Sequence, residues 1–352
     1  MPQYCFNMLY RTKNLHGGDI YEGNIELDFS ANVNPFGTPD GVKSAIKACT
    51  ETLSSYPDPY CRRLVSAIAE YEKVPKESIL VGAGAAELIY SFNRAQKPRT
   101  AVELAPTFAE YSLSLEGADI KRFLLSEKDG FRLSGELIDF IDDTKPDTVF
   151  LCNPNNPTGL SASPELILAA ADKCRSIGAR LFLDECFMDL ADTGESFVPH
   201  LAEYPNVIVL KAFTKSFGMA GVRLGYALSA DAELLCAMSR SVQPWNVSTL
   251  AQQAGIAALK EKEFLENTRG HLINERPRFT TQLENCNLTV YESNVNFLLV
   301  KGAEDLDEKL LKKGIKIRNC ANFSGLGAGF YRIAVKLREQ NDRLIQAIKE
   351  VL

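Results

Sequence analysis

The sequence predicts an α/β protein whose large domain is a mostly parallel sheet sandwiched by helices, followed by a small α+β C-terminal domain. Three observations predict this fold. Strands and helices alternate through residues 78–226, which is typical of parallel sheets. The predicted strands are apolar throughout, as expected for strands covered on both faces. After about Ser229 the pattern becomes largely helical and then mixed, which indicates a second domain.

Size and composition limit the function. The 352 residues, 45% of them hydrophobic, are enough for a large core. A net charge of -6 without a long basic run argues against nucleic-acid or membrane partners. There is no signal-like or transmembrane run, and the nine cysteines form no Cys-x-x-Cys pair, so we expect a cytoplasmic protein with reduced thiols. With three histidines, a His-rich metal site is not expected.

The chain before the sheet is expected to form an arm over residues 1–37, with a strand-like segment at 25–30. Helices are predicted from Thr38 to about Leu53 and over residues 62–72. Between them, the proline-rich residues 56–60 form a rigid linker.

The large domain is expected to span residues 38–235 and the small domain residues 236–352. Further predicted strands lie at residues 78–81, 100–104, 120–125, 148–152, 180–183, 206–210, 223–226, 296–300, 315–318 and 330–335. Further predicted helices begin near residue 85 and span residues 106–115, 135–141, 164–176, 232–265 with an interruption at 243–245, the following stretch to about 284, 305–312 and 339–352.

Four polar features follow predicted strands. They are the glycine turn at 82–87, the sequence NPNNPTG at 153–159, Asp184 and Lys215. A glycine turn that opens a helix exposes backbone N–H groups that suit a phosphate. Because ligands of parallel sheets bind beyond the carboxyl ends of the strands, these features predict a single site.

Residues 213–223, FTKSFGMAGVR, contain two cations that suit an aldehyde cofactor with a phosphate. Lys215 directly follows a buried strand, so desolvation can lower its pKa and free it to form a Schiff base. Arg223 is close enough to return and pair with the phosphate. Lys211 is the nearest alternative, but it lies too early in the turn. On its own this motif also fits a surface loop with two solvated cations.

In chain order, these features resemble the fold-type I pyridoxal-phosphate enzymes, the large aminotransferase family, over nearly the whole chain. The resemblance implies that Lys215 binds the cofactor covalently and that Asp184 keeps the pyridine nitrogen protonated, so that the ring can accept electrons. Asn156 would bond the ring's 3-oxygen and also lie beside the substrate. Phe108 would stack on the ring.

The same resemblance implies a phosphate site and a homodimer with shared active sites. The residues implied for the cofactor phosphate are Gly84, Ala85, Thr214 and Arg223, together with Tyr56 reaching from the neighbouring subunit.

Two positions depart from the family pattern. Three residues before the lysine, relatives usually carry a Ser or Thr that contacts the phosphate, and this chain has Ala212. Three residues after the aspartate, many aminotransferases carry a Tyr that contacts the 3-oxygen, and this chain has Phe187. The second departure removes one hydroxyl contact to the cofactor, which counts against ordinary transamination.

Within the family, the chain resembles the cobalamin-pathway threonine-phosphate decarboxylases, which are themselves similar to histidinol-phosphate aminotransferases. The segments that carry this resemblance are residues 16–18, 28–35, 243–247, 317–323 and 330–334. The resemblance implies that Arg332 binds the substrate α-carboxylate. It also implies that Arg318, the turn at His16 and Gly17, and Asn32 bind the substrate phosphate.

The expected reaction is the decarboxylation of L-threonine O-3-phosphate to (R)-1-amino-2-propanol O-2-phosphate for a cobamide. Three alternatives stay open: serine phosphate as the substrate, transamination of histidinol phosphate or a related amine, and a non-catalytic protein that retains the pocket. The bond at Cα that lies perpendicular to the cofactor ring is the one that breaks, and the sequence does not fix that dihedral angle.

Overall fold

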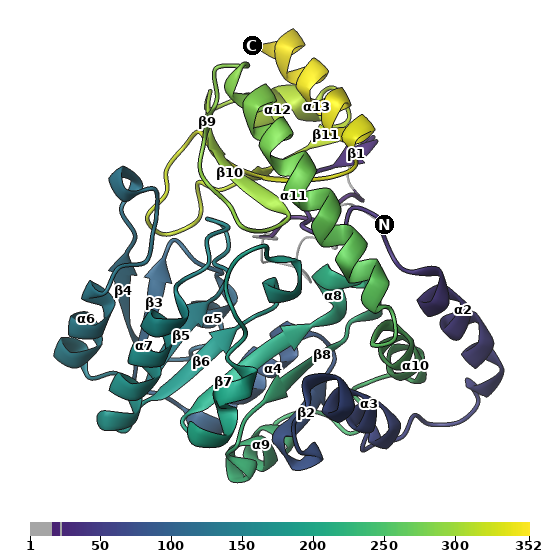
Figure 1. The fold of residues 1–352 in the computed structure, drawn as a ribbon, viewed down its shortest axis with the longest axis vertical. Helices are drawn as coiled ribbons and strands as arrows, with labels where there is room; N and C mark the ends of the chain where they lie inside the picture. Colours follow the sequence, from purple (N-terminus) through teal and green to yellow (C-terminus); the bar gives the residue numbers. More distant parts are fainter. Residues whose placement is uncertain (1–15, 22) are drawn as a thin grey trace, which may run out of the picture.

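A seven-stranded sheet forms the centre of the computed structural model, which describes residues 16–21 and 23–352 (Figure 1). Its strands, in spatial order, are β2 (Ile79–Gly82), β8 (Gly225–Leu228), β7 (Val207–Ala212), β6 (Arg180–Asp184), β5 (Thr148–Cys152), β3 (Thr100–Ala105) and β4 (Asp119–Leu124). Strand β8 runs in the direction opposite to that of the other strands in this sheet. The prediction of a mostly parallel sheet is therefore confirmed.

Helices cover both faces of this sheet (Figure 1). They are α3 (Arg62–Glu72), α4 (Ala85–Gln96), α5 (Glu110–Leu113), α6 (Glu136–Thr144), α7 (Pro164–Ser176), α9 (Ala232–Ser239) and α10 (Thr249–Ala258). Successive residues of a strand point to opposite faces. Accordingly, Phe182 and Ile208 pack in the core with α4 and α9, whereas Leu181 and Val209 pack in the core with α6 and α7.

The C-terminal part is built on a second, antiparallel sheet. Its strands, in order, are β12 (Arg318–Asn319), β13 (Phe330–Ala334), β10 (Phe297–Lys301) and β9 (Thr289–Val290). Three helices accompany it, α11 (Lys262–Glu284), α12 (Leu306–Leu311) and α13 (Arg338–Val351), and in Figure 1 the long helix α11 runs between the two parts of the molecule.

The N-terminal arm is joined to this C-terminal part. Strand β1 (Leu27–Asp28) pairs in parallel with β11 (Ile315–Lys316). This pairing brings residues that follow His16 close to the strand that precedes Arg318. The first fifteen residues of the predicted arm lie outside the described residues.

Several predicted elements are shorter or divided. The first predicted helix is α2 (Asp40–Ala48), followed by the 3-10 helix η1 (Cys49–Thr52). The predicted strand at 315–318 is split into β11 and β12, which pair in different sheets. Arg223 precedes β8 because its φ of 59° is incompatible with a strand.

The helical region after residue 232 divides at local caps. Asp231 accepts a hydrogen bond from Leu234 N at the start of α9, and Ser248 accepts one from Ala251 N at the start of α10. The remaining 3-10 helices are η2 (Lys76–Ser78), η3 (Glu127–Asp129), η4 (Met188–Leu190), η5 (Val198–Glu203) and η6 (Ala220–Val222). Among the described residues, no helix combines the length and apolar character needed to cross a membrane.

Candidate active site

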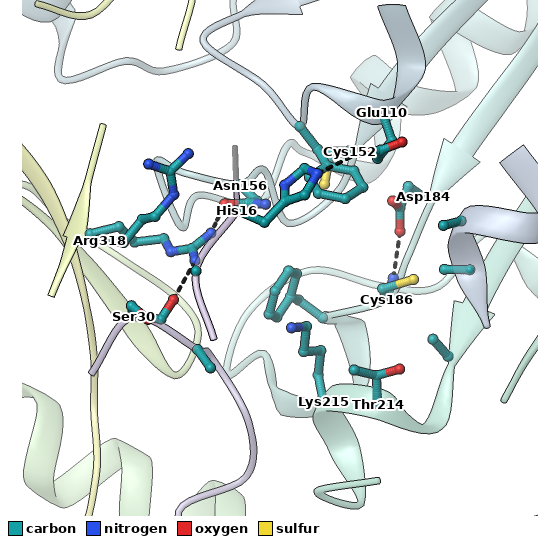
Figure 2. A pocket seen from close by; sticks show the side chains of 18 of the residues that line it. His16, Ser30, Glu110, Cys152, Asn156, Asp184, Cys186, Thr214, Lys215 and Arg318 are labelled. Atoms are coloured by element: carbon teal, nitrogen blue, oxygen red, sulfur yellow. Dashed lines mark hydrogen bonds and ion pairs between the residues drawn. The ribbon is translucent and has the colours of Figure 1, made fainter. Parts of the chain in front are cut away.

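A cavity of about 390 Å³ opens at the carboxyl ends of β5, β6 and β7 (Figure 2). Side chains from the large sheet, the C-terminal sheet and the arm line it together. Predicted site residues on its wall are His16, Gly17, Ala85, Phe108, Asn156, Asp184, Thr214, Lys215, Arg223, Arg318 and Arg332. Folding therefore gathers side chains from most of the length of the chain in one cavity.

Asp184, the last residue of β6, is held in a fixed orientation at the cavity wall. Its Oδ2 accepts a hydrogen bond of 2.6 Å from the Tyr111 hydroxyl, and its Oδ1 accepts one of 2.9 Å from Cys186 N. Burial raises the pKa of Asp184, while the hydrogen bonds from Cys186 and Tyr111 act in the opposite direction. A buried carboxylate of this kind suits a cationic partner such as a protonated pyridine nitrogen.

Tyr111 is a residue that the sequence reasoning missed. Tyr111 lies in α5 and is fully buried. Its ring stacks on Phe150, with 5.4 Å between ring centroids, and also contacts the ring of Phe108. Its spacing of three residues from Phe108, at the start of a helix, was the signal that could have drawn attention to it.

Lys215 lies in α8 (Phe213–Ser216), directly after β7, and in Figure 2 its side chain points into the cavity. Burial lowers the pKa of Lys215 to about 8, and the charge of Arg332 contributes to the shift. About one tenth of the amine is therefore neutral and nucleophilic at pH 7, a far larger fraction than for a lysine with an ordinary pKa. The Nζ atom lies 5.7 Å from the ring centroid of Phe187, the residue that departs from the family pattern.

Arg223 and Gly84 form one side of a cradle for an anion. A Cβ atom at position 84 would lie 2.7 Å from Nη2 of Arg223, so the guanidinium group requires glycine there. Gly84 also has a φ of +95°, a conformation that favours glycine. Next to it, Ala85 begins the twelve-residue helix α4, whose first N–H groups have no helical partner. Together with Thr214 on the cavity wall, these groups fit a phosphate.

In the loop at residues 153–159, two neighbouring asparagines have different roles. Asn155 holds the loop, because it accepts from Thr107 Oγ1 at 2.9 Å and donates to Pro106 O at 3.0 Å. Asn156 faces the cavity, where its Oδ1 accepts a hydrogen bond from Arg332 Nη1 (Figure 2).

Arg332 connects three parts of the chain. It lies in β13, bonds Asn156 in the loop, and donates from Nη2 to Ser30 O in the arm at 2.8 Å. It is 8% exposed, and burial lowers its pKa to about 10. Ser30, which also lines the cavity, was not among the predicted site residues.

The outer part of the cavity holds Arg318 and His16. Arg318 Nη2 donates to Asn322 Oδ1 at 2.8 Å, and its guanidinium group lies 5.1 Å from the ring centroid of Phe323. His16 Nε2 lies 2.5 Å from Glu110 Oε1, a contact visible in Figure 2. Glu110 is another wall residue that the sequence reasoning missed.

Besides Gly84, which directly precedes the wall residue Ala85, two predicted residues do not line the cavity. Asn32 is fully buried next to Ala31 on the wall, and its side-chain amide has no hydrogen-bond partner among the described residues. Tyr56 is 81% exposed and packs on Trp245, with ring centroids 4.9 Å apart. The role predicted for Tyr56 concerns the site of another subunit and stays a prediction.

The residues present fit pyridoxal phosphate. A buried carboxylate, a lysine with a lowered pKa and an anion cradle stand around one cavity at the strand ends of a mostly parallel sheet. This fold and site define a fold-type I pyridoxal-phosphate-dependent enzyme.

Comparison with known proteins supports the same class. Residues 24–348 match the family model for aminotransferase class I and II. The chain is 38% identical over 353 residues to the threonine-phosphate decarboxylase of Salmonella typhimurium, an alignment that covers 96% of each protein. It is 34% identical over 330 residues to a histidinol-phosphate aminotransferase of Caldanaerobacter subterraneus, with 92% of each covered.

Among solved structures, the histidinol-phosphate aminotransferase of Clostridium acetobutylicum matches with a TM-score of 0.86 and 30% identity, over 92% of this chain and 98% of that one. The chain belongs to the class I and II aminotransferase family. Its cofactor is pyridoxal phosphate.

Proposed function

We propose that this enzyme decarboxylates L-threonine O-3-phosphate to (R)-1-amino-2-propanol O-2-phosphate, a step of cobamide synthesis. The single observation that carries the proposal is the pair Arg318 and Arg332 on the wall of the cavity that holds Lys215. A phosphorylated amino acid has two anionic ends, and two guanidinium groups suit them. The 38% identity to a threonine-phosphate decarboxylase supports the same substrate.

Arg332 is assigned to the substrate carboxylate. It is buried and fixed by Asn156 and Ser30, so a carboxylate bound there would have a defined orientation. Arg318 is assigned to the phosphate, with His16, Gly17 and Asn32 as further contacts.

The cofactor is assigned to the inner end of the cavity. Its phosphate would be held by Gly84, Ala85, Thr214 and Arg223, its 3-oxygen by Asn156, and its ring face by Phe108. Bound there, pyridoxal phosphate supplies an electron sink for the pair left when a bond at Cα breaks.

Three residues of the chain are assigned roles in the reaction. Arg332 orients the carboxylate so that it leaves as carbon dioxide, with the bonding electrons remaining behind. Asp184 keeps the proton on the ring nitrogen throughout. The Lys215 side chain, in its protonated ammonium form, would give a proton to Cα and so act as the general acid of the reaction.

The proposal includes a homodimer in the cytoplasm. The exposed pair Tyr56 and Trp245 supports an interface at which Tyr56 reaches the neighbouring cofactor phosphate. None of the described cysteines forms a disulfide, which is consistent with a reducing compartment.

Substrate incubation tests the reaction directly. The purified enzyme with pyridoxal phosphate is incubated with L-threonine O-3-phosphate, without a 2-oxo acid, and carbon dioxide and product mass are measured. We expect equal amounts of carbon dioxide and aminopropanol phosphate. Parallel incubations with L-serine O-phosphate test the choice of phospho-amino acid, because one methyl group gives only about 1–3 kcal/mol of discrimination.

Transamination of histidinol phosphate is the second candidate function. The 34% identity to a histidinol-phosphate aminotransferase favours it. Histidinol phosphate has no α-carboxylate, so both arginines could act only on its phosphate. Turnover that requires histidinol phosphate and 2-oxoglutarate, without carbon dioxide from either phospho-amino acid, would replace the first proposal with this one.

A further inference from the structure

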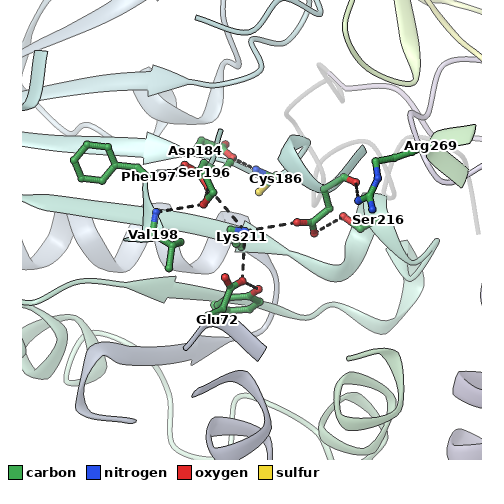
Figure 3. A network of polar contacts seen from close by, with 12 residues as sticks. Glu72, Asp184, Cys186, Ser196, Phe197, Val198, Lys211, Ser216 and Arg269 are labelled. Atoms are coloured by element: carbon green, nitrogen blue, oxygen red, sulfur yellow. Dashed lines mark hydrogen bonds and ion pairs between the residues drawn. The ribbon is translucent and has the colours of Figure 1, made fainter. Parts of the chain in front are cut away.

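A buried ionic network lies around Lys211 in β7 (Figure 3). The Lys211 Nζ atom is 3.4 Å from Glu72 Oε1, 3.6 Å from Asp189 Oδ1 and 3.9 Å from Glu185 Oε2. Burial disfavours the ammonium group, but the carboxylates outweigh it and raise the pKa of Lys211. We refer to Lys211, Glu72, Glu185 and Asp189 as the Lys211 network.

The Lys211 network lies on the side of the sheet opposite the cofactor cavity. Ala212 and Asp184 line the cavity. Their neighbours in the chain, Lys211 and Glu185, therefore point to the other face. The network packs behind the same strand ends that present Asp184 and lead into Lys215.

Asp189 connects the network to the helix that carries Lys215. One carboxylate oxygen, Oδ1, faces Lys211, and the other, Oδ2, accepts a hydrogen bond of 2.9 Å from the Ser216 hydroxyl. Arg269 Nη1 donates to Asp189 O at 3.1 Å and holds the backbone of the same residue. Ser216 directly follows Lys215 and is fully buried.

Helix α8 depends on such contacts for its position. It has four residues, and a helix this short has little stability of its own. Besides Asp189, Asn34 holds its end, with Asn34 N donating to Lys215 O at 3.0 Å and Asn34 Nδ2 donating to Ser216 O at 2.8 Å. A reacting amine must be held to within about 0.5 Å of the position from which it can react.

We propose that Asp189, held by Lys211, is a positioning residue for Lys215, because it anchors the Ser216 hydroxyl and so fixes the backbone from which Lys215 reaches the cofactor. The inference rests on the part of the proposed function that makes Lys215 the cofactor-binding lysine, and it is independent of the substrate. Its alternative is a network that only stabilises the fold.

Two serine-to-alanine variants separate these readings without changing any charge. Ser216→Ala removes the hydroxyl that Asp189 anchors. Ser196→Ala is the matched control, since the Ser196 hydroxyl donates to Glu185 Oε2 at 2.5 Å, at the end of the network away from α8. Asp189→Asn is a third variant, which weakens the link to Lys211.

The readouts are the rate at which cofactor-free enzyme binds pyridoxal phosphate, followed by absorbance, the pH titration of that absorbance, and urea unfolding. We expect Ser216→Ala and Asp189→Asn to slow cofactor binding about tenfold, the factor that one hydrogen bond to a charged group supplies, and to shift the titration. Ser196→Ala should leave the rate of cofactor binding and the pH titration near those of the wild type, although it also lowers the free energy of unfolding.

Two results would overturn the inference. One is wild-type binding and titration in Ser216→Ala, with only stability reduced. The other is an equal slowing in Ser216→Ala and Ser196→Ala. A failure of the underlying assignment looks different, because Lys215→Ala would then still give the absorbance of the lysine-bound cofactor.

Discussion

Arg318 and Arg332 lie directly opposite each other on the antiparallel strands β12 and β13. Opposed residues of an antiparallel pair point to the same face, which here is the wall of the cavity. Two like charges side by side repel each other, and burial lowers the pKa of both groups. A ligand with two anionic ends would relieve this repulsion, so we expect the substrate to bind best with both charges present.

Arg318→Ala should mainly impair the recognition of phosphate. We expect its kcat/KM for L-threonine O-3-phosphate to fall about 30-fold or more, chiefly through KM, as is typical when one partner of a charged pair is removed. The value for unphosphorylated threonine should change much less. Steady-state kinetics of both substrates check this prediction, and an unchanged ratio between them would show that Arg318 does not contact the phosphate.

Arg332→Lys should reduce both binding and chemistry. Lysine keeps the charge but cannot form a fork, and it leaves Asn156 Oδ1 or Ser30 O without its donor. We expect kcat to fall by roughly 100-fold because the orientation of the carboxylate is loosened. Pre-steady-state kinetics separate the two effects. A variant with normal kcat and only a raised KM would contradict a role in orientation.

Lys215→Ala should abolish turnover and the absorbance of the lysine-bound cofactor. In the wild type, the lowered pKa of about 8 makes the fraction of neutral amine rise roughly tenfold between pH 7 and pH 9 and then level off. The rate of cofactor binding by the cofactor-free enzyme should follow this curve. A rate that continues to rise steeply above pH 9 would indicate a lysine with an ordinary pKa.

Asp184→Asn should keep the cofactor but slow the reaction. A neutral amide cannot hold the proton on the ring nitrogen, so we expect a loss on the order of 100-fold in kcat. Cofactor content and kcat, measured on the same sample, distinguish this result from simple loss of the cofactor. Near-normal activity would mean that another acid performs this task. Glu185 is unsuited to it, since its side chain lies on the opposite face of the sheet in the Lys211 network.

Glu185→Gln should flatten the dependence of stability on pH. Burial raises the pKa of Glu185 from 4.5 to about 7, so the folded protein holds a proton that the unfolded chain has lost. The free energy of unfolding therefore falls as pH rises through this window, by up to about 3 kcal/mol from this group. Urea unfolding at pH 5 and pH 7.5 measures the difference. An equal change in the free energy of unfolding between the two pH values, in variant and wild type, would contradict the raised pKa of Glu185.

The sequence alone determined the features that depend on short stretches of chain. Apolar strands in alternation with helices predicted the mostly parallel sheet, and Asp184 and Lys215 could be placed at strand ends because each directly follows an apolar run. Gly84 could be recognised because it lies in a glycine turn between a predicted strand and a predicted helix. These predictions needed only the direction of the chain and the alternation of side chains along a strand.

Only the tertiary structure decided which distant residues meet. The Tyr111 hydroxyl bonds Asp184 across 73 positions of sequence, and β1 of the arm pairs with β11 near the C-terminus. The sequence around Lys211 contains no pattern that predicts its three carboxylate partners. Such contacts depend on how whole helices and sheets pack, because side chains remote in sequence become neighbours only when apolar faces are buried together.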